Sequence, residues 1–164
     1  MANDLLNGKR ILIVDDEADV LETLKELLSM CTLVEASTFD EARSRLEQET
    51  FDIAILDIMG VDGYKLLEIA NEKKIPAVML TAHALSVDDT VKSFKEGAAS
   101  YVPKEEMIHI AAFLEDILVA RKTGKNLLRR WFERLGNFYG RRFGPDWQEK
   151  DKEFWKKYSD KYWF

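Results

Sequence analysis

The chain of 164 residues contains one cysteine, three prolines and no apolar run near the roughly 20 residues that a membrane-crossing helix needs. Because Cys31 has no second cysteine to pair with, an intramolecular disulfide is excluded, and a reducing compartment is expected. Residues 1–10 lack the basic start and the long apolar centre of a secretory signal. We therefore expect a cytoplasmic protein that depends on an apolar core and has no membrane partner.

Two histidines and one cysteine are too few for the usual zinc sites, which draw on several such ligands. No glycine-rich loop follows the first β-branched run, Ile11–Val14, and this disfavours a nucleotide- or flavin-binding module. Neither kind of site is expected in this chain.

The net charge of −6 conceals a strong asymmetry along the chain. Residues 1–120 carry −13, whereas residues 121–164 carry +7 together with 12 of the 18 aromatic residues and all four tryptophans. Two regions of such different composition indicate two different purposes. We predict an N-terminal tail over residues 1–8, a domain over residues 9–121 and an extension over residues 122–164.

Within the first 120 residues, five short apolar runs alternate with five stretches of helical periodicity. The apolar runs are Ile11–Val14, Thr32–Glu35, Phe51–Leu56, Ile75–Leu80 and Ala99–Val102. Capping-box patterns at Thr38 and Ser86 mark the starts of two of the helices, and the fifth helix is predicted from Glu105 to about Arg121. The alternation predicts an α/β fold with a doubly wound, five-stranded parallel sheet covered on both faces.

Polar residues stand where these predicted strands end. Asp15 and Asp16 follow the first strand, Asp57 follows the third, Thr81 the fourth, and Lys104 comes after the fifth. Taken alone, two adjacent aspartates fit a solvated turn or a helix cap. In a parallel sheet, however, the carboxyl ends of the strands meet at one edge, where ligands bind. We therefore expect all five side chains to converge.

Three carboxylates at one edge repel each other unless a cation lies among them. Mg²⁺ is such a cation, since it prefers oxygen ligands and usually takes one or two carboxylates. One aspartate could then attack phosphorus as a nucleophile, with catalysis by positioning and charge neutralisation. Lys104 would supply positive charge to the phosphoryl oxygens, and Thr81 a hydroxyl donor.

The ordered set resembles the receiver domain of two-component response regulators, over about residues 9–121. Its members are Asp15-Asp16, Asp57, Thr81-Ala82, Tyr101 and Lys104. The resemblance implies a flavodoxin-like strand order 2-1-3-4-5. It also implies that Asp57 accepts a phosphoryl group from a histidine kinase or phosphotransfer protein. Such a chain is a signalling phosphoacceptor and not an enzyme acting on other substrates.

The resemblance also assigns the remaining site residues. Asp16 and Asp57 would bind Mg²⁺ directly, helped by the backbone carbonyl of Met59, and Asp15 would act mainly through water. Lys104 would pair with Asp57 and then with the phosphoryl group.

A conformational switch is implied as well. Thr81 would move toward the phosphoryl group and let Tyr101 turn inward, which would alter the face made by the fourth helix, fifth strand and fifth helix. Tyr101 could instead be an ordinary core aromatic. His83, two positions after Thr81, is either a residue overhanging the site or a plain surface histidine.

Two features depart from the family pattern. The loop from Asp57 to Gly63 takes six positions where the family usually has eight, and it lacks the usual proline. Glu105 stands after Lys104, where many receivers have a proline, so we expect a trans peptide bond there. The shortened loop should affect the rates of phosphorylation or dephosphorylation.

The extension has apolar and aromatic residues at helical spacing on either side of a turn at Arg141–Asp146. The first stripe comprises Leu127, Leu128, Trp131, Phe132, Leu135, Phe138 and Tyr139. The second comprises Trp147, Phe154, Trp155, Tyr158 and Tyr162. The pattern predicts a C-terminal α-helical hairpin that resembles no family.

Three interpretations of this hairpin remain open. It could pack on its own receiver or on a second copy in a homodimer, it could dock another protein, or it could bind nucleic acid or an anionic membrane. Six acidic residues in the same segment weaken the last interpretation, so nucleic-acid and membrane partners are not expected.

A different class of function is a Mg²⁺-dependent phosphohydrolase that uses Asp57 as its nucleophile. Such enzymes usually need a second acid two positions after the nucleophile, where this chain has Met59. Turnover of p-nitrophenyl phosphate distinguishes the two classes.

Overall fold

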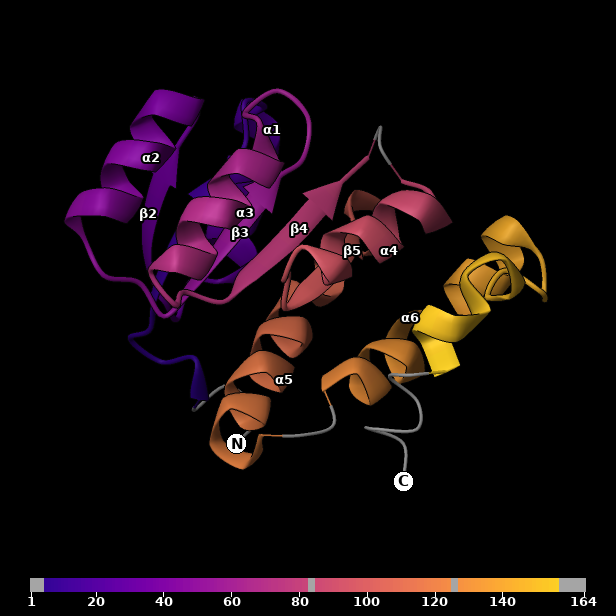
Figure 1. Cartoon of the computed structure of the whole chain (residues 1–164). Helices are drawn as coiled ribbons and strands as arrows, with labels where there is room; N and C mark the ends of the chain where they lie inside the picture. The colour runs from indigo at the N-terminus through magenta and orange to yellow at the C-terminus, as the bar shows by residue number, and fades with distance from the viewer. Residues whose placement is uncertain (1–4, 83–84, 125–126, 157–164) are drawn as a thin grey trace.

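A computed structural model describes residues 5–82, 85–124 and 127–156. Its centre is a five-stranded, entirely parallel sheet with the order β2-β1-β3-β4-β5 (Figure 1), which confirms the predicted fold class and topology. The strands are β1 (Arg10–Val14), β2 (Thr32–Ala36), β3 (Ile53–Asp57), β4 (Ala77–Thr81) and β5 (Ser100–Pro103).

Helices cover both faces of this sheet. In Figure 1 the second and third helices lie in front of the strands, and the first lies behind them. The α-helices are α1 (Ala18–Leu27), α2 (Phe39–Gln48), α3 (Gly63–Glu72), α4 (Val87–Lys95), α5 (Ile110–Thr123) and α6 (Leu127–Phe143). Strands β3 and β4 are buried at every residue, and β1 at every residue after Arg10. Burial on both faces explains why these strands are continuous apolar runs.

The predicted helix starts are confirmed by their caps. The side chain of Thr38 accepts a hydrogen bond from the backbone N–H of Glu41 at 3.2 Å, and that of Ser86 accepts one from Asp89 at 2.9 Å. Each cap satisfies one of the backbone donors that a helix leaves unpaired at its N-terminus.

The fifth helix differs from the prediction, because α5 begins only at Ile110. Residues Lys104–His109 form a 3₁₀-helix, η2, in which no side chain is buried. Met107 packs against the core but is only partly buried, and Ile108 is 70% exposed, so this segment has no buried stripe that would hold it as an α-helix. The N-terminal segment also joins the core, since Leu6 is completely buried and the Gly8 N–H donates to the Met30 carbonyl.

The C-terminal extension is helical and lies along α4, β5 and α5 (Figure 1). Gly144, in the left-handed region at φ +99°, ends α6, and its N–H donates to the Gly140 carbonyl at 3.0 Å. A 3₁₀-helix, η3 (Glu149–Asp151), then leads into a helical stretch over residues 152–156. The turn predicted at Arg141–Asp146 is therefore present from Gly144 onward, whereas residues 141–143 belong to the last turn of α6.

Both apolar stripes face inward over the part that the structure describes. The buried side chains are Leu128, Trp131, Leu135, Tyr139, Trp147, Phe154 and Trp155. They cover the receiver's own surface, as the fold-back interpretation expected. Tyr158 and Tyr162 lie outside the described residues, and the homodimer stays a prediction. Among the described residues, no helix combines the length and the apolar character needed to cross a membrane. The cytoplasmic location stays a prediction, as do the three domain boundaries.

The substitution Gly63→Ala should destabilise the fold. A Cβ at Gly63 would overlap the carbonyl oxygen of Asp57 and lie 2.8 Å from the Cα of Ile58. Because both neighbours are backbone, the loop after β3 must move, and we expect a loss of about 1–3 kcal/mol in the free energy of unfolding, measured with urea. Gly136→Ala in α6 is the matched control. Its Cβ would meet nothing within 4 Å, so it should be neutral or stabilising by about 0.5–1 kcal/mol. Equal losses in the two variants would contradict the close approach at Gly63.

Candidate functional site

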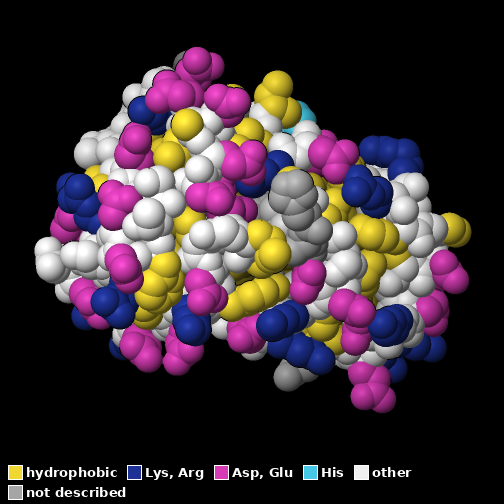
Figure 2. Space-filling view, turned by 90° about the horizontal axis from the view of Figure 1, so that it is seen from above, with side chains coloured by type: hydrophobic (Ala, Val, Ile, Leu, Met, Phe, Trp, Pro, Cys, Tyr) yellow, Lys and Arg dark blue, Asp and Glu magenta, His cyan; other side chains and the backbone are white. Residues whose placement is uncertain are grey.

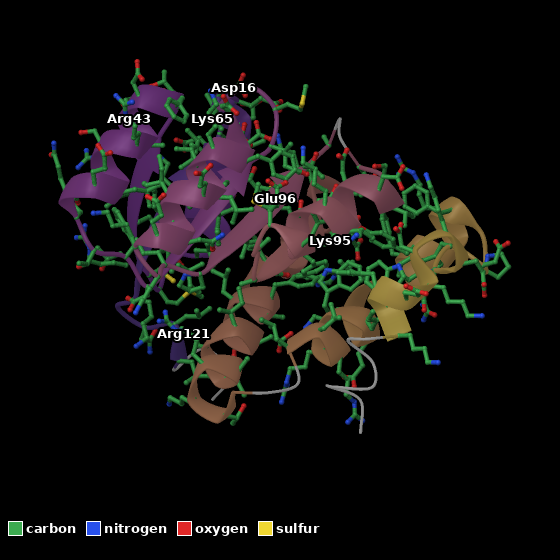
Figure 3. The ribbon with its side chains drawn as sticks, viewed as in Figure 1. Asp16, Arg43, Lys65, Lys95, Glu96 and Arg121 are labelled. Carbon is green, nitrogen blue, oxygen red and sulfur yellow. The ribbon has the colours of Figure 1, made fainter. Side chains whose placement is uncertain are left out.

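The carboxyl ends of four adjacent strands bring the predicted site residues to one edge of the sheet. Asp15 directly follows β1, Asp57 ends β3, Thr81 ends β4, and Lys104 directly follows β5. Asp16, labelled in Figure 3, lies at the top of the molecule on this edge. The convergence expected from the parallel sheet is thus present in the structure.

Lys104 links three carboxylates at this edge. Its Nζ lies 2.9 Å from Oδ2 of Asp15, 2.9 Å from Oε1 of Glu17 and 3.4 Å from Oδ1 of Asp57. Lys104 comes from the far end of β5, so these ion pairs connect it to β1 and β3 across the sheet edge. Because Lys104 is only 11% exposed and the two aspartates are buried, solvent screens these two pairs weakly, whereas Glu17 is 52% exposed.

An acidic cluster stands beside this lysine. Ligand atoms of Asp15, Asp16 and Glu17 all lie within 4.8 Å of one another. Asp15 is completely buried and accepts a hydrogen bond from the Glu17 N–H at 2.9 Å, whereas Asp16 is exposed. Figure 2 looks onto this edge, and acidic side chains outnumber basic ones over the left half of the surface. Glu17 was not predicted as a site residue, although its position in a run of three acids is a signal in the sequence.

Burial and like charges disfavour ionisation of the two inner aspartates. Burial, and then the charge of Asp15, raises the pKa of Asp57 to about 7 despite the nearby Lys104. Burial also raises the pKa of Asp15. Burial acts to lower the pKa of Lys104, but hydrogen bonds to Glu17 and Asp15 outweigh it, so that this pKa is raised and the lysine stays charged.

The loop between β3 and α3 closes the site on one side. Gly60 has φ +83°, and a Cβ there would lie 2.5 Å from Oδ2 of Asp16, so the loop backbone approaches that carboxylate closely. Asp62, the N-cap of α3, also adopts the left-handed conformation, at φ 55°. The left-handed conformations of Gly60 and Asp62 allow the shortened loop to reverse direction within a few residues. The Met59 side chain is 55% exposed beside it.

Thr81 and Tyr101 are as deeply buried as Asp15 and Asp57. Thr81 is 1% exposed, and Tyr101 is completely buried. The Tyr101 hydroxyl lies within hydrogen-bonding reach of the Thr90 side chain and the Ser86 backbone, and burial raises its pKa. Tyr101 is therefore in an inward orientation. All described peptide bonds are trans, including the one after Lys104, as expected. His83 lies outside the described residues.

The donor set fits a magnesium ion. Carboxylates are hard oxygen ligands, and the cluster is compact. The pKa of Asp57 is raised first by burial and then by the charge of Asp15, and a divalent cation would offset both effects. A nucleophilic oxygen of Asp57 next to the Lys104 ammonium, with a hydroxyl at Thr81, is an arrangement suited to receiving an anionic phosphoryl group.

Comparison with known proteins agrees with this geometry. Residues 11–114 match the response regulator receiver domain family. A probable transcriptional regulator, ycf27 of Guillardia theta, is 40% identical over 132 residues, which cover 74% of this chain and 49% of that protein. The transcriptional regulatory protein ResD of Bacillus subtilis is 32% identical over 121 residues, covering 68% of this chain and 50% of ResD. The chain thus spans about half the length of these relatives.

Solved structures extend the likeness to the whole receiver fold. A putative response regulator from Chloroflexus aurantiacus is 27% identical with a TM-score of 0.61, and the match covers 69% of this chain and 99% of that one. The BeF₃-activated receiver domain of DrrB, from Thermotoga maritima, is 25% identical with a TM-score of 0.61, and the match covers 68% of this chain and 97% of that one. The chain belongs to the response regulator receiver domain family.

Proposed function

We propose that Asp57 is the phosphoacceptor of a two-component phosphorelay. An oxygen of Asp57 attacks the phosphorus of a phosphohistidine on a histidine kinase or phosphotransfer protein. The new P–O bond forms as the P–N bond breaks, and the imidazole nitrogen keeps the electron pair and takes up a proton. The observation that carries this proposal is the position of Asp57 at the sheet edge, 3.4 Å from Lys104 and next to the acidic cluster.

Magnesium is the proposed cofactor, with Asp16 and Asp57 as direct ligands and the Met59 carbonyl as a third. Asp15 serves mainly through water, because one of its oxygens accepts the Glu17 N–H and the other faces Lys104. When bound, the ion neutralises the carboxylates and the incoming phosphoryl oxygens. Asp16 is exposed, so a hydrated ion can reach its carboxylate from solvent.

Lys104 then holds the phosphoryl group by charge, and Thr81 donates its hydroxyl to a phosphoryl oxygen. The inward Tyr101 is proposed to report this state to the face made by α4, β5 and α5. Its burial and its proximity to Thr90 support that role.

Nucleic acid is the partner class raised by the names of the two relatives described above, both of which are called transcriptional regulators or regulatory proteins. For this chain we propose a different use of the extension's positive charge. Its basic side chains pair with acids of the receiver, as Arg134 does with Asp116 and Lys150 with Asp88.

Asp57 should be the residue that carries the phosphoryl group. Incubation with acetyl phosphate and Mg²⁺ should add one phosphoryl group to the full-length protein, seen in the intact mass, and Asp57→Asn should abolish it. Asp62→Asn, an exposed neighbour in the same loop, should label normally. Labelling that persists in Asp57→Asn contradicts the assignment. Sustained turnover of p-nitrophenyl phosphate would favour the phosphohydrolase instead.

The substitution Asp16→Asn should weaken Mg²⁺ binding and stabilise the metal-free protein. Asp16→Asn removes one ligand and one like charge, so Mg²⁺ affinity should fall at least tenfold while the melting temperature without metal rises. Isothermal titration and thermal denaturation measure the two effects. Asp19→Asn, at an exposed position of α1, should leave Mg²⁺ affinity unchanged. An unaltered affinity in Asp16→Asn would support the plain-turn interpretation of the adjacent aspartates.

The raised pKa of Asp57 predicts how stability depends on pH without metal. Between its ordinary value of 3.8 and about 7, the folded chain binds more protons than the unfolded chain, so the free energy of unfolding falls as the pH rises. Asp57→Asn lacks this loss. In EDTA, its stability advantage over the wild type should therefore grow by about 2 kcal/mol from about pH 5.5 to about pH 7 and then level off. A constant difference across this range, measured by urea unfolding, would show that the pKa is not raised.

A further inference from the structure

The extension matches the charge of the surface that it covers. Arg134 donates to both oxygens of Asp116 on α5, at 2.5 and 3.0 Å. Arg142 lies 2.7 Å from Glu105 of η2, and Lys150 lies 2.8 Å from Asp88 of α4. The Asp116 carboxylate is the most buried of these groups, at 6% exposure, so its bidentate pair is the strongest constraint on register. The charge asymmetry of the sequence is thus used within one molecule.

Trp131 is the centre of the contact. It is 2% exposed, and its ring meets Phe94 of α4 edge to face, with centroids 5.3 Å apart. On its other side it stacks on Trp155 at 6.0 Å. Lys95, labelled in Figure 3, lies with its ammonium 5.8 Å from the Phe154 ring. A buried aromatic anchor ringed by charged pairs is the anatomy of a specific protein interface.

Two buried hydrogen bonds reach into the receiver. The Trp131 Nε1–H donates to the backbone carbonyl of Tyr101 at 2.8 Å. The hydroxyls of Tyr139 and Thr90 are 2.6 Å apart. Since Thr90 donates to the Ser86 carbonyl at 2.7 Å, the Tyr139 hydroxyl is the donor to Thr90. The Thr90 hydroxyl thus pairs with Tyr139 of the extension, and it also lies within hydrogen-bonding reach of the Tyr101 hydroxyl.

Strand β5 connects these bonds to the site. Tyr101 and Lys104 are only three residues apart. Trp131 bonds to the backbone of β5 at Tyr101, and Asp15 and Asp57 pair with Lys104 just after the strand ends. In the docked arrangement Lys104 is already within ion-pair reach of Asp57. The extension and a phosphoryl group on Asp57 should therefore favour the same position of β5.

We propose that residues 127–156 are an internal partner of the α4–β5–α5 face, and that their docking and phosphoryl binding at Asp57 strengthen each other. The docked segment would keep the Tyr101 side chain inward, because Trp131 and Tyr139 would block its rotation toward solvent. It also occupies a surface that a second copy or a target would otherwise meet. This inference rests on the proposed function of Asp57. Any coupling of this kind must be reciprocal, since each ligand changes the other's affinity by the same factor.

The test measures the affinity of the full-length protein for beryllofluoride, in the presence of Mg²⁺, by calorimetry. Trp131→Phe removes the donor to Tyr101 but keeps an aromatic ring, and Tyr139→Phe removes the donor to Thr90. Each should weaken beryllofluoride binding by about fivefold or more. The matched control is Arg129→Gln, whose side chain pairs with Glu133 on the same helix, and its affinity should equal that of the wild type. In the wild type, beryllofluoride should also slow amide hydrogen exchange in α6.

The outcomes separate the two proposals. If the wild type does not bind beryllofluoride, the proposed function of Asp57 fails. If it binds and both variants bind equally well, the coupling is overturned. Tighter binding by the variants would overturn the sign and make the segment an inhibitor of phosphoryl binding. If protection of α6 disappears on dilution along with a dimer seen by sizing, the partner of this face is a second copy and the internal docking is refuted.

Discussion

Two buried carboxylates, those of Asp15 and Asp57, share the ammonium of Lys104, and this arrangement shapes the rest of the molecule. The parallel sheet makes it possible, because β1, β3 and β5 all end at the same edge, where the long Lys104 side chain reaches both carboxylates. The lysine does not fully offset burial and the charge of Asp15, which together raise the pKa of Asp57 to about 7. The site therefore lacks positive charge, which a divalent cation would supply. An apo fold that tolerates such a deficit gives up some stability at its functional site.

The composition of the extension imposes a second constraint, because this short segment has an excess of apolar and basic side chains. Such residues cannot form a core alone at this length, so they need a surface. The α4–β5–α5 face supplies apolar contacts at Phe94 and acids at Asp88 and Asp116. Covering this face places the extension against β5, the strand that Lys104 directly follows. The site and the extension thus both constrain the position of the same strand, β5.

Much of this arrangement could be predicted from the sequence. Periodicity and capping boxes gave the alternating elements, because strands buried on both faces and capped helices have local signals. Strand ends located the polar residues, and the resemblance to receivers gave the order of the strands. The pairing of Lys104 with Glu17 could not be found this way, because it depends on how side chains meet across the sheet edge. The irregular start of the fifth helix was missed for a related reason, since its 3₁₀ turn reflects missing burial and not a local breaker.

The extension was the least predictable part. Its amphipathic pattern indicated helices that need a cover, but a pattern does not say which surface provides it. The choice depends on the bond between Trp131 and the Tyr101 backbone and on the shared hydroxyl of Thr90, both of which join residues distant in sequence. The shortened loop before Gly63 was visible in the sequence, whereas its close approach to Asp16 through Gly60 was not.

A crystal structure of the full-length protein with Mg²⁺ and beryllofluoride tests the central claim most directly. The account predicts the fluoride complex on an oxygen of Asp57 within reach of Lys104 and Thr81. It also predicts the metal on Asp16, Asp57 and the Met59 carbonyl. Density for the ion among Asp15, Asp16 and Glu17 alone, with no beryllofluoride on Asp57, would contradict it.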